Sequence, residues 1–255
     1  MANRPLQFLQ PGERTNPAGK PVTNQLLLSI PDNEYRAIRP ALEFEDLPHH
    51  VNLHQPHESQ EFAHFPNNGL ISLVIVLNGG KSVEAGLVGN EGFTGTPGIA
   101  GLARSPFLEI VQISGEGFRV PIGVLRDVIA SAPQLRRMLE RHSILLGLQI
   151  AQTAACNRLH GVEQRLARWL LMAQDRVDSG VLPITHDFLA TMLGTDRPSV
   201  SLAAGVLQRN QIIEYNRGSV KILNRDALER AACECYSVIR QYSEDRQLSP
   251  QMSRS

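Results

Sequence analysis

Residues 182–213 read LPITHDFLATMLGTDRPSVSLAAGVLQRNQII, and this stretch decides the fold of the C-terminal part of the chain. Apolar residues at helical spacing fill its first half, and a second helical pattern follows directly after Gly194-Thr195. Two short helices joined by a tight, glycine-containing turn form a helix-turn-helix, whose second helix can enter the major groove of DNA. The next stretch, IIEYNRGSVKIL at 212–223, predicts two strands with Arg217-Gly218 at their turn. Together these patterns predict a winged helix-turn-helix and indicate DNA binding.

Basic residues gather on this segment, although the whole chain has a formal net charge of zero. Zero net charge counts mildly against nucleic acid as a partner, because phosphate contacts need lysine and arginine, but the local distribution matters more. Between positions 197 and 221 the chain has four basic residues and one acidic residue, a local net charge of +3: Arg197, Arg209, Arg217 and Lys221 against Glu214. This balance favours DNA over the alternative, a winged helix that binds protein.

The composition is that of an ordinary globular protein. The 255 residues are 42% hydrophobic and 20% charged, which is typical of a folded chain of two domains. No apolar run approaches the ~20 residues of a membrane span. The N-terminus is polar, rich in proline and glycine, and lacks a signal-peptide core. We therefore expect a cytoplasmic protein without a membrane partner.

The first half of the chain has the pattern of a β domain. Residues 1–23 indicate a flexible tail, and residues 24–42 predict a helix or two. Between 43 and 119, short apolar or alternating runs are separated by glycine-containing turns: 71–77, 83–88, 108–113 and 118–121. Many short strands at regular spacing predict a sandwich, barrel or jelly roll.

A long helix follows this β domain. Residues 122–131 predict a short helix, and Pro133 opens a long one that Gly161 ends, because glycine is the common terminator just past a helix. Seven positions at alternating steps of four and three form a coiled-coil seam: Leu135, Leu139, His142, Leu146, Gln149, Thr153 and Cys156. The second half of this seam is polar or small, so the seam alone is a weak dimeriser. The alternative is a helix packed on the β domain of its own chain.

The order of these parts predicts an α+β chain. An apolar stripe at 162–173 predicts one more helix before the helix-turn-helix, and 226–242 predict a last helix with a frayed end. The expected parts are a flexible tail (1–23), a jelly-roll sensory domain (24–132), a dimerisation helix (133–160), a winged helix-turn-helix domain (161–232), and a C-terminal helix and tail (233–255). Two subunits would present their recognition helices about 34 Å apart, one turn of DNA. The junction at Gly161 is the expected hinge.

At these residues the chain resembles the Crp/Fnr family of bacterial transcription regulators, over roughly 24–230. LPITHDFLATMLGTDRPSVS with the following LQRNQII carries the resemblance most specifically, and HFPNNGLISLV at 64–74 resembles the strand–turn–strand ahead of the family's ligand-binding core. The resemblance implies a cyclic-nucleotide-binding-like jelly roll and a homodimer on a palindromic operator. It implies double-stranded DNA, RNA polymerase and a small-molecule effector as partners. It also implies a regulator that is not an enzyme; the alternative is a metal-dependent, cupin-like enzyme, which the many histidines suggest.

The candidate DNA-binding residues lie at the start of the first helix, on the second helix and on the wing: Thr185, Arg197, Ser199, Ser201, Arg217, Ser219 and Lys221. Arg197 is the best base reader, because it lies in the first turn of the second helix and its planar fork matches the two acceptors of guanine, a contact worth ~1–3 kcal/mol. Thr185 is expected to cap the first helix. The buried side of the second helix is predicted at four positions: Val200, Ala203, Ala204 and Leu207.

Other readings of these residues stay open. The two serines are either DNA contacts or solvated surface, and the wing residues Arg217 and Lys221 are either phosphate contacts or ordinary surface. Asp196 departs from the family, which often has a basic residue at that position. Its charge suits a helix N-terminus but repels phosphate.

The effector is unidentified or absent. The resemblance places Thr96 where cyclic-nucleotide binders carry a glutamate, and Arg104-Ser105 about where their phosphate-binding arginine segment lies. On the long helix, Ile150-Ala151 stand where cyclic-AMP responders have Thr-Ser. Thr96, Arg104 and Ser105 are therefore the expected effector pocket, with Arg104 as a solvent-facing loop residue as the alternative. Cyclic AMP itself is not expected.

No metal or other cofactor is expected. His54 and His57 could share a metal, but no carboxylate or cysteine completes a set around the loop histidines His49, His50 and His64. No cysteine precedes Cys156, which excludes an N-terminal iron–sulfur cluster of the kind the resemblance would imply. The three cysteines make no disulfide framework, and their spacing matches no zinc or cluster pattern. Cys156 is expected to pack as a small hydrophobe, with redox sensing as the alternative, and Cys233 and Cys235 to be structural or incidental.

Overall fold

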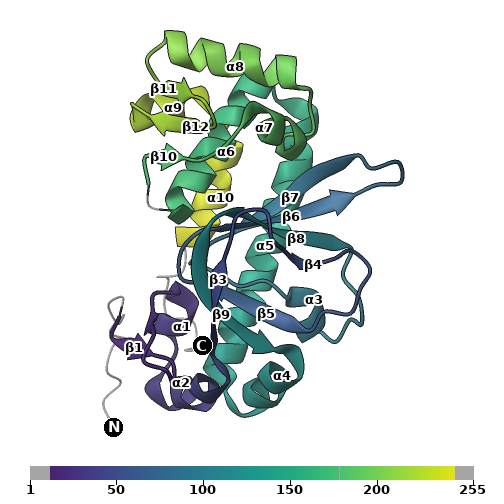
Figure 1. Cartoon of the computed structure of the whole chain (residues 1–255), viewed down its shortest axis with the longest axis vertical. Helices are drawn as coiled ribbons and strands as arrows, with labels where there is room; N and C mark the ends of the chain where they lie inside the picture. The colour runs from purple at the N-terminus through teal and green to yellow at the C-terminus, as the bar shows by residue number, and fades with distance from the viewer. Residues whose placement is uncertain (1–11, 178, 245–255) are drawn as a thin grey trace, which may run out of the picture.

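A computed structural model describes residues 12–177 and 179–244 of the chain (Figure 1). The winged-helix domain lies at one end of an elongated molecule, and the N-terminal helices with α4 lie at the other. The jelly roll lies between them, and the long helix α5 runs beside it. Within the described part of the chain, no helix is both long enough and apolar enough to cross a membrane.

The N-terminal segment is anchored from residue 12 onward. It forms a small hairpin and two short helices with a 3-10 turn: β1 (Arg14–Thr15), β2 (Pro21–Val22), α1 (Gln25–Ser29), α2 (Asp32–Ile38) and η1 (Arg39–Ala41). The buried guanidinium of Arg14 donates to the carbonyl oxygens of Leu27 and Ile30 and to Asp32. Residues 12–23 therefore differ from the expected flexible tail, because one buried arginine ties them to the helices. Residues 1–11 lie outside the described part.

The jelly roll consists of two antiparallel sheets with strand orders β3-β9-β5 and β4-β8-β6-β7. Its elements are β3 (Glu43–Leu47), β4 (Asn52–His54), β5 (Phe62–Pro66), β6 (Leu70–Val76), β7 (Ser82–Val88), α3 (Thr96–Ile99), β8 (Phe107–Ile113) and β9 (Gly115–Pro121). The sequence patterns located the last four strands. They missed the first two, which are short or carry polar residues that weaken an alternating pattern, whereas part of β5 fell within the strand–turn–strand that the resemblance placed at 64–74. The expected class of fold is confirmed.

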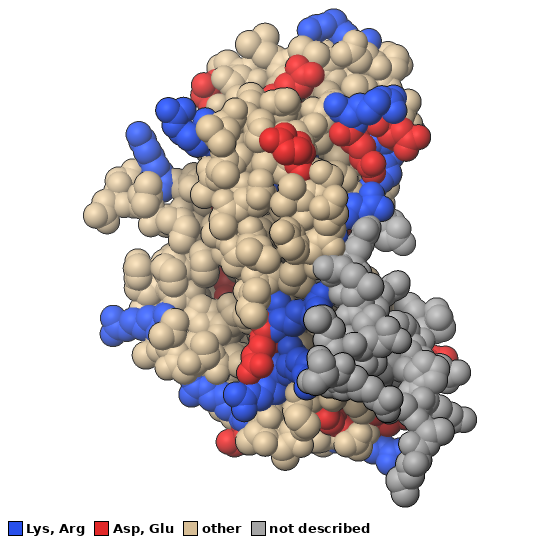
Figure 2. Space-filling model, turned by 180° about the vertical axis from the view of Figure 1, so that it is seen from behind, with Lys and Arg blue, Asp and Glu red and all other residues tan. Residues whose placement is uncertain are grey.

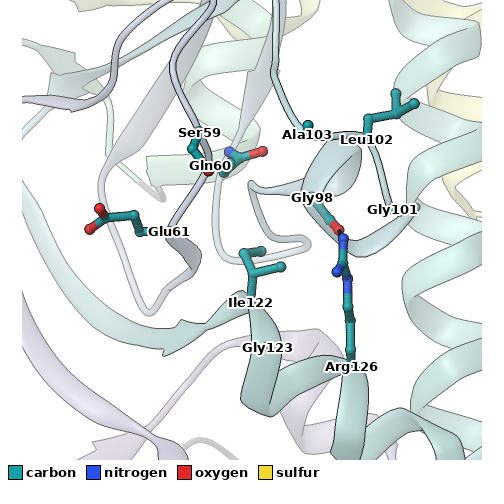
Figure 3. A pocket seen from close by; sticks show the side chains of 10 residues that line it. All are labelled: Ser59, Gln60, Glu61, Gly98, Gly101, Leu102, Ala103, Ile122, Gly123 and Arg126. Carbon is teal, nitrogen blue, oxygen red and sulfur yellow. Dashed lines mark hydrogen bonds between the residues drawn. The ribbon is translucent and has the colours of Figure 1, made fainter.

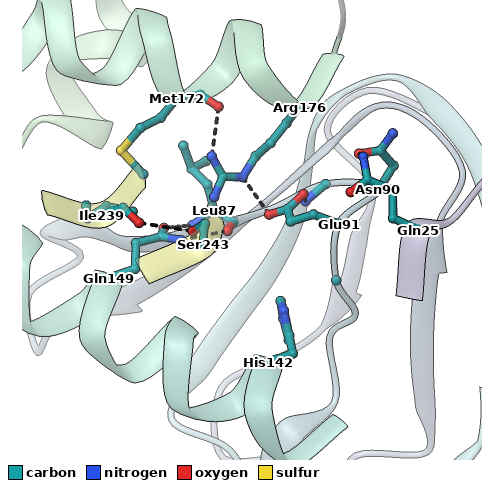
Figure 4. Close-up of polar contacts among 12 residues, drawn as sticks. Gln25, Leu87, Asn90, Glu91, His142, Gln149, Met172, Arg176, Ile239 and Ser243 are labelled. Atoms are coloured by element: carbon teal, nitrogen blue, oxygen red, sulfur yellow. Dashed lines mark hydrogen bonds and ion pairs between the residues drawn. The ribbon is translucent and has the colours of Figure 1, made fainter. Parts of the chain in front are cut away.

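Two helices close this domain, α4 (Ile122–Ser131) and α5 (Pro133–Leu159). All seven positions of the predicted dimer seam on α5 are buried by the chain itself. The side chain of Gln149 bonds both the N–H and the carbonyl of Leu87 on β7 (Figure 4). His142 Nε2 lies 3.1 Å from the Phe93 carbonyl oxygen. The seam prediction was therefore wrong: most of that stripe packs on the N-terminal helices and jelly roll of its own chain, where Gln149 and His142 bond backbone groups. Its last two positions, Thr153 and Cys156, contact Arg168 and Cys233 instead.

The winged-helix domain follows directly. Its elements are α6 (Val162–Val177), β10 (Val181–Leu182), α7 (His186–Met192), α8 (Arg197–Arg209), β11 (Ile213–Asn216), β12 (Ser219–Ile222), α9 (Arg225–Ala231) and α10 (Cys235–Glu244). The three strands form one antiparallel sheet of order β10-β12-β11. The single last helix predicted at 226–242 is in fact two, because the chain is extended at Ala232. After this break α10 packs on α5 and α6.

The two domains share one continuous core. Leu70, Leu87 and Ile113 of the jelly roll belong to the same buried cluster as Trp169 and Leu170 of α6. Arg176 of α6 also forms a 2.8 Å ion pair with Glu91, in which both side chains are largely buried (Figure 4). The winged helix is thus docked on its own sensory domain.

Candidate nucleic-acid interface

Capping side chains set the two helices of the helix-turn-helix. Thr185 caps α7 by accepting a 3.2 Å hydrogen bond from the Phe188 N–H, and Asp196 caps α8 by accepting a 2.8 Å bond from the Ser199 N–H. Gly194 takes a φ of +58° at the turn, a conformation that glycine adopts at little cost. Local residue chemistry therefore explains why this stretch folds as two helices, and the expected capping role of Thr185 is confirmed.

The second helix, α8, lies at the outer end of the molecule, away from the jelly roll (Figure 1). Its buried side consists of the four predicted residues: Val200, Ala203, Ala204 and Leu207. On the opposite side Arg197, Ser201 and Leu202 are exposed, and Ser199 is half-buried. A helix held by one apolar side and free on the other is what entry into a groove requires.

Arg197 is the first residue of α8, and 64% of its side chain is exposed. Its Nη1 lies 3.3 Å from Oδ2 of Asp187, whose side chain is 68% exposed. Ion pairs between such exposed groups are worth only ~0–1 kcal/mol, so the guanidinium can exchange this carboxylate for a base edge at little cost. Base contact by Arg197 remains a prediction.

Asp196 faces solvent beside Arg197. The hydrogen bond from the Ser199 N–H lowers the pKa of this carboxyl, which therefore stays charged near neutrality. Asp196 stabilises the start of α8, but its charge repels an approaching phosphate.

A second polar contact ties α7 to α8 and to the wing. His186 Nδ1 lies 3.0 Å from Ser201 Oγ, and the imidazole ring stacks on Tyr215 of β11 at 3.9 Å between centroids. Burial, and then the nearby Arg197 charge, lower the pKa of His186, which favours its neutral form. Ser201 is therefore held in place on the exposed side of α8. Sequence patterns had not singled out His186.

The wing turns at Arg217 and Gly218, and Gly218 takes a φ of +78°. Arg217 and Lys221 are exposed, whereas Ser219 is half-buried. Lys221 lies directly opposite Glu214 in the strand register, so the wing's basic charge is partly offset. The expected hairpin is confirmed, and its phosphate contacts remain a prediction.

Leu202 is a residue that sequence reasoning missed. Its side chain is 74% exposed on the free side of α8, although leucine usually seeks burial. An apolar side chain at this place can contact the methyl group of thymine. The available signal was its position off the buried stripe of the helix.

The opposite face of the molecule carries charges of both signs. Seen from behind (Figure 2), basic and acidic side chains lie next to one another near the winged-helix end, with broad uncharged surface between them. Lower on this face, basic side chains gather beside the grey atoms with an acidic side chain among them. DNA contact is expected elsewhere, at the end of the molecule that α8 and the wing form, because the exposed side of α8 lies there.

The jelly roll contains a cavity of about 500 Å³ (Figure 3). Its lining comes from the segment before β5, from α3 with the loop after it, and from α4: Ser59, Gln60, Glu61, Gly98, Gly101, Leu102, Ala103, Ile122, Gly123 and Arg126. The guanidinium of Arg126 donates to the carbonyl oxygen of Gly98, and the distance from Nε to that oxygen is 3.0 Å (Figure 3).

The three expected effector residues flank this cavity without lining it. Thr96 opens α3, Arg104 is exposed and pairs with Ser59 as an isolated bridge, and buried Ser105 accepts a bond from the Phe107 N–H. Thr96, Arg104 and Ser105 are thus not among the residues that line this cavity, and their role in effector binding remains a prediction. The alternative reading of Arg104 as a solvent-facing loop residue holds.

Buried polar groups lie against the cavity. Gln60, one of its lining residues, donates a 2.6 Å bond from Nε2 to Oε1 of Glu109. Three buried atoms in this neighbourhood have no hydrogen-bond partner among the described residues: Gln60 Oε1, Glu109 Oε2 and His54 Nε2. Of these three residues only Gln60 lines the cavity. Since buried polar groups are normally paired, unsatisfied ones beside a cavity indicate a place for a polar ligand or water.

The histidines do not gather into a metal site. His49, His50 and His57 are exposed, whereas buried His64 bonds Glu45 at 2.6 Å. No group of three or more metal-ligating side chains in the described ranges includes His54 or His57. The three cysteines, by contrast, lie together with His160, which their sequence spacing did not indicate.

Comparison with known proteins identifies one domain and the fold. Residues 164–231 match the Crp-like helix-turn-helix domain family. The fold resembles FixK2 of Bradyrhizobium japonicum, with a TM-score of 0.64 and 14% identity over 75% of this chain and 98% of that one. It also resembles the c-di-GMP responsive global regulator CLP of Xanthomonas campestris, with a TM-score of 0.63 and 13% identity over 75% and 99%. A third similar structure is a CRP/FNR family regulator of Thermus thermophilus, with a TM-score of 0.61 and 20% identity over 74% of this chain and 98% of that one.

None of the curated proteins matches the sequence of this chain. At the identities above, the solved structures establish the fold, and the domain match establishes the Crp-like helix-turn-helix. The resemblance drawn from residues 182–213 is thereby confirmed.

Proposed function

The chain carries a Crp-like helix-turn-helix domain on the fold of the Crp/Fnr transcription regulators, and from this premise we propose that it binds a palindromic operator as a homodimer. Exposed Arg197 at the start of α8, on the outer end of the molecule, carries this proposal. Arg197 reads base edges, and Thr185, Arg217, Ser219 and Lys221 contact phosphates. RNA polymerase, the further partner that the resemblance implies, belongs to the same proposal.

The proposed dimer uses the exposed side of α5, since the side first expected is buried. Ile144, Leu148, Ala151 and Ala155 are all exposed and follow steps of four, three and four, which is the spacing of a coiled-coil seam. Ile144 is 66% exposed, Leu148 is 44% exposed and Leu159 further along is 74% exposed. Large apolar side chains in one exposed row mark an interaction surface, and small alanines let two helices approach.

The proposed effector is a small polar molecule held in the jelly-roll cavity. The unpaired Oε1 of Gln60, which lines the cavity, is an acceptor that a ligand with N–H or O–H donors would satisfy. Such a ligand regulates DNA binding only if it binds the DNA-competent arrangement more tightly than the other arrangement.

Selection of DNA from a random duplex pool by the full chain tests the proposal. We expect enriched sequences with two inverted half-sites whose centres lie about 10 base pairs apart, bound by two chains. Affinity should fall steeply with salt, by ~10³-fold or more between 50 and 200 mM if six or more phosphates are contacted. No enrichment, or binding that salt leaves unchanged, would favour the protein-interaction module.

A further inference from the structure

All three cysteines of the chain meet one histidine at the junction between the two domains. Cys156 lies in the last turn of α5, His160 directly follows that helix, and Cys233 and Cys235 lie between α9 and the first turn of α10. Their ligand atoms all lie within 4.8 Å of one another. Cys156 Sγ is 3.5 Å from Cys233 Sγ, and Cys235 Sγ is 3.6 Å from Nδ1 of His160.

These separations fit four ligands around one ion. In a tetrahedral zinc site with Zn–S bonds of 2.3 Å, neighbouring sulfur atoms lie about 3.8 Å apart. The observed 3.5 and 3.6 Å separations are close to that edge length. A Cys156–Cys233 disulfide would use only two of the four groups. It would not explain why Cys235 and His160 lie beside them.

Two neighbouring side chains, Glu234 and Gln152, contact the proposed ligands and orient them. His160 Nε2 lies 3.3 Å from Oε1 of Glu234, so a proton held there leaves Nδ1 with its lone pair directed at the thiols. Metal-binding histidines commonly donate their other ring N–H to a carboxylate in this way. Gln152 of α5 donates to Cys235 Sγ at 3.1 Å.

The charge of the surroundings also fits. Three thiolates, a neutral imidazole and a divalent ion would carry a net charge of −1, and buried Arg165 and Arg168 lie beside the thiols. Nε of both arginines and Nη1 of Arg168 have no hydrogen-bond partner among the described residues. A buried anionic site would compensate cations that are otherwise left unmatched.

We propose that Cys156, His160, Cys233 and Cys235 form a Cys₃His site for a single divalent transition-metal ion, with zinc as the preferred one. Thiolate and imidazole ligands in this ratio are typical of structural zinc sites. The ion would join the end of the long helix to the start of α10, directly beside Gly161. It would therefore hold the junction through which the jelly roll and the winged helix are connected.

Metal analysis of the full chain, purified under reducing conditions, tests this proposal. We expect one zinc per chain, and in the metal-free chain we expect Co²⁺ to produce the visible absorption of a tetrahedral site with thiolate-to-metal charge transfer. Cys156→Ser, Cys233→Ser and His160→Ala should each abolish or greatly weaken this binding. The matched control His49→Ala changes an exposed histidine and should bind as the wild type does.

Variants that lose a buried thiol can also fail to fold, so Glu234→Gln provides a milder test. The side chain of Glu234 is 71% exposed, and its loss should weaken zinc binding ~10–100-fold while circular dichroism stays unchanged. The proposal is overturned if the folded, reduced wild-type chain binds neither Zn²⁺ nor Co²⁺. It is equally overturned if Cys233→Ser and His160→Ala, shown to be folded, bind metal as the wild type does.

Discussion

The indole N–H of Trp169 on α6 donates a 2.8 Å hydrogen bond to Oε1 of Glu84 on β7 and so joins the winged helix to the jelly roll. The hydroxyl of Ser72 donates to the other oxygen of this carboxyl at 2.6 Å. Glu84 is buried, and its two oxygens are both bonded inside the interface between the domains. The docking of the two domains thus includes an acidic group whose protonation matters for stability.

Glu84→Gln should remove a pH dependence of stability. Burial raises the pKa of Glu84 from 4.5 to about 7, although the Ser72 and Trp169 bonds oppose this shift. Because the folded chain then holds a proton that the unfolded chain has lost, stability falls as pH rises from about 4.5 to about 7 and levels off above that, in total by about 3 kcal/mol. Denaturant unfolding at pH 5, 6, 7 and 8 measures this slope. The variant should lose the slope and be more stable than wild type at pH 8, whereas Glu214→Gln on the exposed wing should keep it.

Arg197→Ala should weaken binding to selected operator DNA ~5–150-fold, which corresponds to the ~1–3 kcal/mol of a bidentate base contact. Binding to scrambled DNA should change much less, and the melting temperature should stay that of wild type because the side chain is exposed. Fluorescence anisotropy with both duplexes measures the ratio. Arg230→Ala, an exposed arginine of α9, is the control. An Arg197→Ala chain that still discriminates as wild type does contradicts the assignment.

Leu148→Glu should convert the dimer into a monomer. The charge would be placed in the exposed row of α5, where a like charge from the second subunit would approach it. Light scattering after size-exclusion chromatography gives the mass directly, and DNA affinity should fall because one half-site must then be bound alone. Leu102→Glu changes a leucine that is 60% exposed outside this row and should leave the dimer intact. Dimers of normal stability in the Leu148→Glu chain would place the interface elsewhere.

Gly161→Ala should change DNA affinity without touching the DNA-binding surface. A methyl group at this position meets no atom within 4 Å, and its φ is not in the left-handed region, so the observed structure accepts alanine. Alanine has fewer accessible backbone conformations than glycine, so the substitution should stabilise the observed structure by ~0.4–1 kcal/mol. It should also disfavour any arrangement whose backbone at the junction only glycine can adopt. Titration of operator DNA with both chains measures the effect. Equal affinities would mean that the junction does not move when DNA binds.

Local patterns were sufficient for the helix-turn-helix and its wing. The features that set these helices act between residues a few positions apart: the caps Thr185 and Asp196, the turn at Gly194 and the apolar stripe of α8. Each of them can therefore be recognised in the sequence. Spacing also predicted the long helix and a sandwich, barrel or jelly roll, and the resemblance then selected the jelly roll. Arg197 could be named in advance because its place in the first turn of a recognition helix follows from these local features.

Which element covers an apolar stripe, or which residue a single side chain contacts, cannot be inferred from local sequence patterns. The spacing from Leu135 to Cys156 requires that one side of α5 be covered. It does not say whether a second subunit or other elements of the same chain cover that side. Cys156 and Cys233 lie 77 positions apart, and only the packing of α10 on α5 brings their sulfur atoms together. Glu84 meets Trp169 across 85 positions in the same way. Short-range periodicity reflects which residues must avoid water, whereas long-range packing selects the groups they meet.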